Sequence, residues 1–340
     1  MGETDTQAYH SETKDKIASY LKEINVELPV EEFIHQISNI YHYHEAMVYD
    51  TKQIGLFDKN HFFQTALASI EDKLPAKIHA LDFGCGTGFG ALEMIKKFGS
   101  RIELLVCFDL SPDMLQKCRE KIERDHKEIS VVYLSDLAEL PKVKDYSFDL
   151  VVTNAVLHHL LNLKAHFDLI DAILKPEGFY LIGHEPNTRF YKNKDLLQHT
   201  LNFQKFKRVA NRMTLDYILT KLKVKSRRKN VSELTIRDLI NKGLIKEPIP
   251  SGKVCKLVDI HVPHGIASEQ PWGFLGFSPE VIIDKFLPNY SLYTHITHTH
   301  IKDDKAMRYA RWRKLDKSLA EKYPKDGAVA LMILQKGIVA

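Results

Sequence analysis

Cysteine is scarce in this 340-residue chain. The four cysteines, Cys85, Cys107, Cys118 and Cys255, form no CxxC pair and do not have the spacing of a metal finger. A disulfide framework of the kind that holds small secreted domains together is therefore excluded. Reduced thiols and a cytoplasmic location are what we expect.

Long apolar runs are also missing. No stretch of about 18 apolar residues exists, and the polar N-terminus (residues 1–16) lacks the apolar core of a signal peptide. We therefore expect no membrane span. The net charge of +4 and the pI near 8.6 fall short of the concentrated positive field of a nucleic-acid-binding protein, so nucleic acid is an unlikely partner.

The spacing of apolar residues changes along the chain from a helical pattern to short, strand-like runs. Residues 12–75 have helical spacing, and five short apolar runs separated by helical stretches then occupy residues 78–183. This order predicts an α/β fold, a Rossmann-like, doubly wound and mostly parallel sheet of seven strands. Later strands are predicted at LVDIHV, SLYTHITHTHI and AVALMIL, with helices at 279–287, after Ser278 as N-cap, and at 304–322.

Four parts follow from these patterns. We predict an N-terminal helical lid (1–75), a cofactor-binding core (76–187), an inserted helical substrate cap (188–255) and a C-terminal part with the closing strands (256–340). The basic run KLKVKSRRK at 221–229 favours a solvated helix face, with an anionic acceptor as the alternative.

A glycine turn follows the first predicted strand. His79–Phe83 runs into Gly84-Cys85-Gly86-Thr87-Gly88, and an apolar helix comes next. Glycines let a ligand approach the backbone, and the N–H groups at the start of a helix favour negative charge. Because Gly86, Gly88 and Ala91 also fit the dinucleotide motif GxGxxA, the turn alone does not choose between ligands.

Carboxylates at the strand ends distinguish the two ligands. Asp82 precedes Gly84 by two positions, where a cationic ammonium gains from it and a pyrophosphate does not. Asp109 ends the next strand, and Asp136 follows the third. Together with LDFGCGTG, VCFDLSPDML and FDLVVTNAVLHHL, this order resembles the motifs of class I S-adenosylmethionine-dependent methyltransferases.

The resemblance implies a set of cofactor contacts. Asp82 would orient the turn or the methionine ammonium, and Asp109 would hold the ribose hydroxyls. The remaining implied contacts are Gly84, Gly86 and Gly88 to the methionine, Leu110 to the adenine face, Asp136 and the Leu137 amide to the adenine edge, and Asn154. Tyr41, Tyr43 and Tyr49 are candidates for a lid over the cofactor.

Within the family, the chain is most similar to the small-molecule branch related to ubiquinone and polyketide methyltransferases. It departs from the nucleic-acid amino-group branch, which carries an Asn/Asp-Pro-Pro-Tyr type of motif where this chain has Asn154-Ala155-Val156-Leu157. The implied function is methyl transfer from S-adenosyl-L-methionine, leaving S-adenosyl-L-homocysteine, to an O, N or C atom of a small molecule. An RNA or protein methyltransferase using the basic cap, and a non-catalytic cofactor-binding subunit, remain alternatives, and the oligomeric state is open.

Two polar pairs at strand ends are the catalytic candidates. A hydroxyl or activated carbon acceptor needs a base, and histidine is suited to that role near neutral pH. We favour His184 as the base or orienting donor with Glu185 as its partner, and keep His158 and His159 as further candidates. A second group of histidines could ligate a metal ion and comprises His261, His264, His295, His298 and His300. We nevertheless predict no metal.

Overall fold

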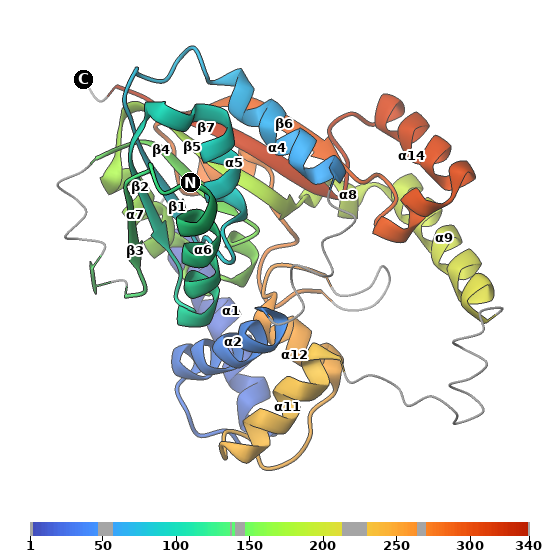
Figure 1. Ribbon diagram of the computed structural model, residues 1–340. Coiled ribbons are helices and arrows are strands. Elements are labelled where there is room, and N and C mark those ends of the chain that lie inside the picture. Colours follow the sequence, from blue (N-terminus) through green and yellow to red (C-terminus); the bar gives the residue numbers. More distant parts are fainter. Residues whose placement is uncertain are drawn as a thin grey trace.

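The computed structural model describes residues 3–46, 57–136, 138–139, 147–212, 230–263 and 270–338. Its centre is a seven-stranded sheet of order β3-β2-β1-β4-β5-β7-β6, in which β7 runs opposite to the other six strands (Figure 1). The strands are β1 (Ile78–Phe83), β2 (Ile102–Phe108), β3 (Val131–Leu134), β4 (Phe148–Asn154), β5 (Leu174–Pro186), β6 (Tyr290–His298) and β7 (Val329–Lys336). The predicted Rossmann-like, mostly parallel sheet is confirmed.

Helices cover both faces of this sheet. Successive strand residues point to opposite faces, so Ala80 packs under α4 and α5 while Leu81 packs toward α7 and α13. Both faces are therefore buried, which explains the nearly continuous apolar runs of the parallel strands. The covering elements are α4 (Phe57–Ser69), α5 (Phe89–Phe98), η2 (Gly99–Arg101), α6 (Pro112–Asp125), α7 (Leu163–Ile173) and α13 (Pro279–Lys285).

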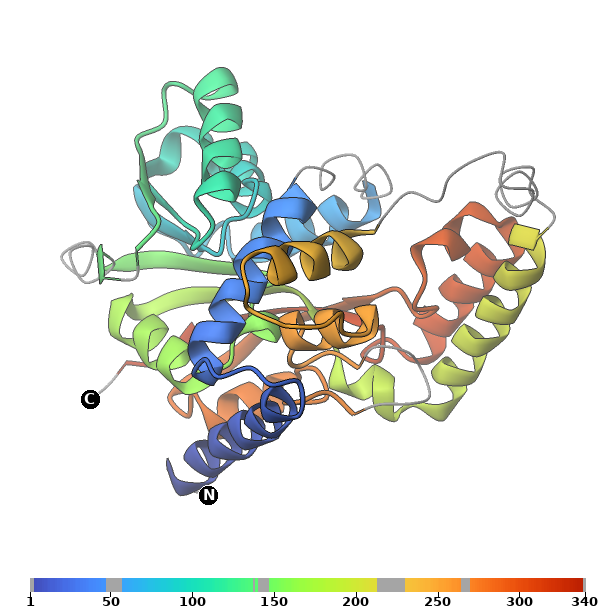
Figure 2. The same ribbon diagram turned by 90° about the horizontal axis from the view of Figure 1, so that it is seen from below.

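A separate helical cluster lies beside the carboxyl ends of the strands. It joins α1 (Glu3–Glu23) and α2 (Val30–Ala46) to α11 (Val231–Asn241) and α12 (Ser251–Val258) around a common apolar core (Figure 2). The strand predicted at LVDIHV is therefore wrong. Leu257 and Val258 end α12, and Ile260 lies in the following turn, because these apolar residues are buried against other helices. A short apolar run cannot by itself distinguish a strand from a buried helix end.

The remaining helices form a second cluster at the far side of the molecule. Here α8 (Thr188–Lys192) and α9 (Lys194–Arg212) pack on η5 (Asp304–Arg308) and α14 (Ala310–Lys322). The described helices between residues 188 and 258 thus divide between two clusters. The boundaries of the four predicted parts remain a prediction, and the basic run at 221–229 lies outside the described residues.

Two local predictions in the C-terminal part can be compared with the structure. Ser278 is the N-cap of α13 and accepts a hydrogen bond from Val281 N at 3.4 Å, with Pro279 in the first turn, as predicted. The predicted helix at 304–322 is interrupted at Tyr309, which separates η5 from α14.

Among the described residues, no helix has the length and apolar character needed to cross a membrane.

Candidate functional site

A cavity of about 550 Å³ opens at the carboxyl ends of β1, β2 and β4, the edge at which ligands bind in open α/β sheets. Its walls come from the glycine turn, the end of β2, the loop after β4, and the helices α1 and α2. The predicted site residues that line it are Gly84, Gly86, Asp109, Leu110, Asn154, His158, His159 and Tyr41. Most of the cofactor residues expected from the sequence therefore meet at one place.

The glycine turn needs its glycines. Gly84 has φ +73°, and a Cβ there would lie 2.5 Å from Cγ2 of Val156. Gly88 has φ +95° at the N-cap of α5, and its Cβ would lie 2.9 Å from Sγ of Cys118. A side chain at either position would clash as well as strain the backbone. The turn can therefore present its backbone to a ligand at the N-terminus of α5, as a cradle for the cofactor requires.

Asp82 lies behind this turn and does not line the cavity. Its side chain is fully buried, and Oδ2 accepts a hydrogen bond from Ala91 N, in the first turn of α5, at 2.7 Å. Burial raises the pKa of Asp82 well above its ordinary value. This contact fits the first of its two expected roles, which is to orient the turn.

Asp109 connects the turn to the next helix. Oδ2 accepts from Gly86 N at 2.7 Å and Oδ1 accepts from Ser111 N at 2.8 Å. Burial raises the pKa of this carboxyl, and the two backbone donors and the nearby His42 counteract the rise. Because a carboxylate oxygen can accept more than one hydrogen bond, both oxygens can still receive a ribose hydroxyl. Leu110, 40% exposed, lies next to it in the cavity wall.

The expected adenine contacts are less complete. Asp136 is exposed, and its Oδ1 accepts from Ala138 N at 2.8 Å, which caps the turn after β3. It does not line the cavity. Leu137 and Tyr49 lie outside the described residues, and Tyr43 is 45% exposed. The adenine role of Asp136 and Leu137 therefore stays a prediction.

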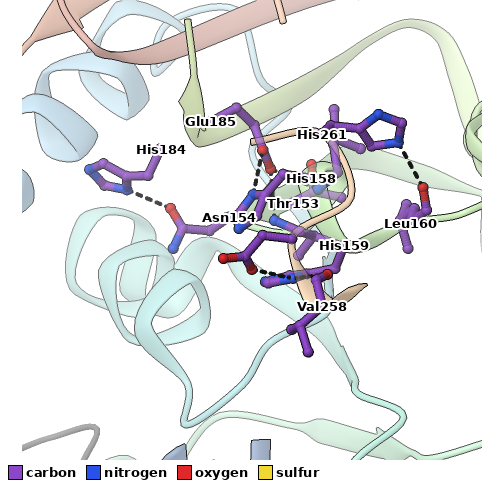
Figure 3. A network of polar contacts seen from close by, with 12 residues as sticks. Thr153, Asn154, His158, His159, Leu160, His184, Glu185, Val258 and His261 are labelled. Carbon is purple, nitrogen blue, oxygen red and sulfur yellow. Dashed lines mark hydrogen bonds and ion pairs between the residues drawn. The ribbon is translucent and has the colours of Figure 1, made fainter. Parts of the chain in front are cut away.

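Glu185 holds His158 in place across two strand ends (Figure 3). The side chain of Glu185 is fully buried at the end of β5, where Oε1 accepts from Val156 N and Leu157 N, each at 2.7 Å. Oε2 accepts from Nδ1 of His158 at 2.7 Å. Because an ionised carboxylate only accepts, Nδ1 carries the ring proton, and Nε2 is the acceptor of a neutral His158 ring. His158 belongs to the short helix η4 (Leu157–His159) and lines the cavity.

His159 is held differently from its neighbour. Its Nδ1 lies 3.1 Å from the carbonyl oxygen of Val258 and 3.2 Å from Oδ1 of Asp259. Burial lowers the pKa of His159, but Asp259 outweighs this effect and the pKa rises to about 9. His159 is therefore a cation at neutral pH. The His42 ring contacts it edge-on with the centroids 5.0 Å apart, and Nδ1 of His42 lies 3.3 Å from Oε2 of Glu45.

Sequence reasoning missed Asp259 and His42. Asp259 stands in LVDIHV, which was read as a strand, and His42 comes from the helix α2, more than 100 residues before His159 in the chain. No local motif marks either residue. Only the packing of α2 and α12 against the loop after β4 brings them into the cavity wall.

His184 points away from this wall (Figure 3). Its φ is +52°, its Nδ1 lies 2.6 Å from Oδ1 of Asn154, and its ring packs near Phe63 and Phe89. It does not line the cavity. Glu185 does not line the cavity either and reaches its wall only through its contacts with His158 and the loop after β4. The expectation that one residue of the pair faces the acceptor region therefore stays a prediction that this geometry does not support, for His184 least of all.

Two groups of described side chains have ligand atoms within 4.8 Å of one another and could hold a metal ion. They are Cys85 with Cys107 and Cys118, and His158 with His159 and Asp259. The late histidines considered in the sequence do not belong to either group. Nε2 of His261 lies 2.9 Å from the Leu160 carbonyl oxygen, Nε2 of His300 lies 2.9 Å from that of Tyr323, and His264 lies outside the described residues.

Comparisons with known proteins agree with this site. Residues 81–182 match the family model described as "Methyltransferase domain". A malonyl-[acyl-carrier protein] O-methyltransferase 2 of Ilyobacter polytropus is 31% identical over 119 residues, which are 35% of this chain and 43% of that protein. The reducing polyketide synthase BOA6 of Botryotinia fuckeliana is 27% identical over 147 residues, 41% of this chain and 6% of that protein. The chain thus spans less than half of the length of these relatives.

Among solved structures, the cyclopropane synthase MmaA2 of Mycobacterium tuberculosis overlaps 81% of this chain and 83% of its own, with 14% identity and a TM-score of 0.40. This overlap is too weak to show a family, whereas the family match and the motifs identify the domain. The matched residues contain the end of β1, all of β2, β3 and β4, the glycine turn and Asp109. The chain therefore contains the S-adenosylmethionine-binding domain of a class I methyltransferase.

Proposed function

We propose that this protein transfers the methyl group of S-adenosyl-L-methionine to an acidic O–H or C–H group of a small-molecule acceptor bound in the cavity. The observation that carries this proposal is the pair formed by His158 and Glu185. A scaffold that only binds the cofactor has no need of a histidine at the cavity wall whose tautomer is fixed by a buried carboxylate.

The chain's residues have separate tasks in this reaction. The glycine turn and Asp109 hold the cofactor, which supplies an electrophilic methyl group when bound. His158 receives the acceptor's proton at Nε2, and Glu185 stabilises the resulting imidazolium through Nδ1–H. His159, kept protonated by Asp259, donates a hydrogen bond to the acceptor and favours its deprotonated form. Positioning of acceptor and donor about 3 Å apart in line supplies much of the remaining acceleration.

The lining of the cavity also favours a small molecule over a nucleic acid. The described lining residues include four carboxylates and no lysine or arginine, whereas a phosphate backbone is bound mainly by lysine and arginine. The carboxylates are Glu31, Glu45, Asp109 and Asp259. This composition argues against the RNA alternative at the reaction site itself.

The test is a search for the acceptor with labelled cofactor. Purified protein is incubated with S-adenosylmethionine carrying an isotope-labelled methyl group and, separately, with the metabolite, RNA and protein fractions of a cell extract. We expect label only in the metabolite fraction, in a compound whose methylated form carries an O–CH₃ or C–CH₃ group. Label confined to RNA or protein would overturn the small-molecule proposal, and bound cofactor without labelled product in any fraction would favour the non-catalytic subunit.

A further inference from the structure

The second helical cluster forms an arm with an unusual charge. We define the basic arm as α9 (Lys194–Arg212) together with residues 302–323, which pack on each other at the far end of the sheet from α1 and α2 (Figure 2). These segments contain thirteen lysines and arginines and five acidic residues, a formal charge of +8. Because the whole chain carries only +4, the rest of the protein is net negative. The arm is thus more strongly positive than the chain as a whole.

Apolar side chains reach the surface in the middle of this arm. Val209 is 59% exposed, Phe206 38% and Tyr309 36%. Phe206 contacts the rings of Tyr309 and Trp312, with the centroids 5.0 and 5.8 Å apart, and Val209 follows three residues later on the same side of α9. The three exposed residues therefore form one apolar surface patch that is continuous with the aromatic core of the arm.

Basic side chains flank the patch. Lys205 and Arg208 alternate with its apolar residues on α9, and Arg308 and Arg313 stand on either side of Tyr309 in the sequence; all four are exposed. Three of the five acidic residues of the arm have partners in or beside it, and one of these, Asp316, accepts from Ile301 N at 2.6 Å. Asp303 pairs with Lys207, and Asp195 accepts from Tyr323 at 2.7 Å. The surface of the arm is therefore apolar and basic together.

We propose that the basic arm docks on an anionic lipid surface, with Phe206, Val209 and Tyr309 entering the interfacial region and the surrounding lysines and arginines contacting headgroup phosphates. Interfacial helices combine these same two features, a set of aromatic and aliphatic side chains and a lysine- and arginine-rich flank. A phosphate backbone of RNA would pair with the basic residues but would gain nothing from an exposed Val209. The attachment is peripheral, and it does not depend on the proposed chemistry.

Vesicle binding tests the proposal directly. The full-length protein is sedimented with vesicles of phosphatidylcholine alone and with vesicles of equal parts phosphatidylcholine and phosphatidylglycerol, at low and at physiological salt. We expect binding to the anionic vesicles only, weakened by salt. The double variant Phe206→Ser/Val209→Ser should reduce this binding at least ten-fold, and Arg308→Gln/Arg313→Gln should reduce it and flatten its salt dependence.

Two control variants keep the test specific. Val132, also 38% exposed but on β3, is replaced by serine, and Lys96 on α5 and Lys127 are replaced by glutamine as matched charge removals away from the arm. Both controls should bind vesicles like the parent protein, and all variants should keep the parent's cofactor affinity. Equal binding to both vesicle types, equal loss in the control variants, or binding to bulk RNA but not to anionic vesicles at physiological salt would overturn the proposal.

Discussion

The two sides of the cavity are built in different ways. On the cofactor side, the contacts join neighbours along the chain or adjacent strands: Asp82 to Ala91, and Asp109 to Gly86 and Ser111. On the acceptor side, Glu185 and His158 also join the ends of adjacent strands, but His159 is held by remote segments: by Asp259 after α12 and by His42 of α2. A local motif can therefore specify the proposed cofactor side, whereas the proposed acceptor wall depends on how the helical cluster packs on the sheet.

The largest effect is expected on the acceptor side. His158→Ala should lower turnover by about 10²-fold or more with nearly unchanged cofactor affinity, because it removes the proposed base. His35→Ala is a matched control, since His35 also lines the cavity but contacts Asn39 on its own helix. Steady-state kinetics with the identified acceptor and calorimetric titration of the cofactor measure both effects. Equal losses in the two variants would contradict a specific role of His158.

On the cofactor side, Asp109→Ala should weaken binding of S-adenosylmethionine by about ten-fold or more. The change removes the charged acceptor of two ribose hydroxyls, and hydrogen bonds to charged groups contribute roughly 1.5–3 kcal/mol. Asp113→Ala, an exposed aspartate in the first turn of α6, is the control. Titration calorimetry gives the dissociation constants, and an unchanged value for Asp109→Ala would mean that the end of β2 does not hold the ribose.

A smaller effect is expected on the pH dependence of folding stability, through two buried histidines. Burial lowers the pKa of His166 to about 3 and that of His261 to about 4, so both are neutral in the folded protein near pH 5. Unfolded histidine, with a pKa near 6.5, binds the proton there. The stability contributed by each residue is therefore present above about pH 6.5 and is lost as the pH falls toward the folded value, with a limiting slope of about 1.4 kcal/mol per pH unit.

His166→Phe should remove one of these two contributions. The hydroxyl group of Tyr180, which contacts His166 at 2.9 Å, keeps its second partner Thr153 at 3.0 Å. Denaturant unfolding between pH 4 and pH 7 should show a shallower loss of stability than in the parent protein. An exposed-histidine control, His61→Gln, should follow the parent, and identical curves for His166→Phe and the parent would refute the assignment.

The smallest effect on turnover is expected for His184→Ala. Its ring lies among Phe63, Phe89 and His298 and outside the cavity wall, so the loss should appear in thermal stability rather than in the rate of methyl transfer. Parallel measurement of melting temperature and turnover separates the two. A large fall in turnover at an unchanged melting temperature would restore the catalytic role predicted from the sequence.

The sequence by itself determined the sheet and the local geometry of the glycine turn and Asp109. Strand-length apolar runs predict a two-sided sheet, and Gly84, Gly88 and Asp109 act within a few residues of a turn, so that their positions in the chain specify their geometry. The choice between His184 and Glu185 needed the backbone: a positive φ at His184 directs its ring toward Asn154, while Glu185 reaches the loop after β4.

Only the tertiary structure decided the rest of the acceptor wall. Asp259 follows the end of α12 and meets His159 across 100 residues of chain, and the apolar run around it did not distinguish a helix end from a strand. The physical reason is that burial between packed helices, rather than any local hydrogen-bonding pattern, fixes where those residues lie.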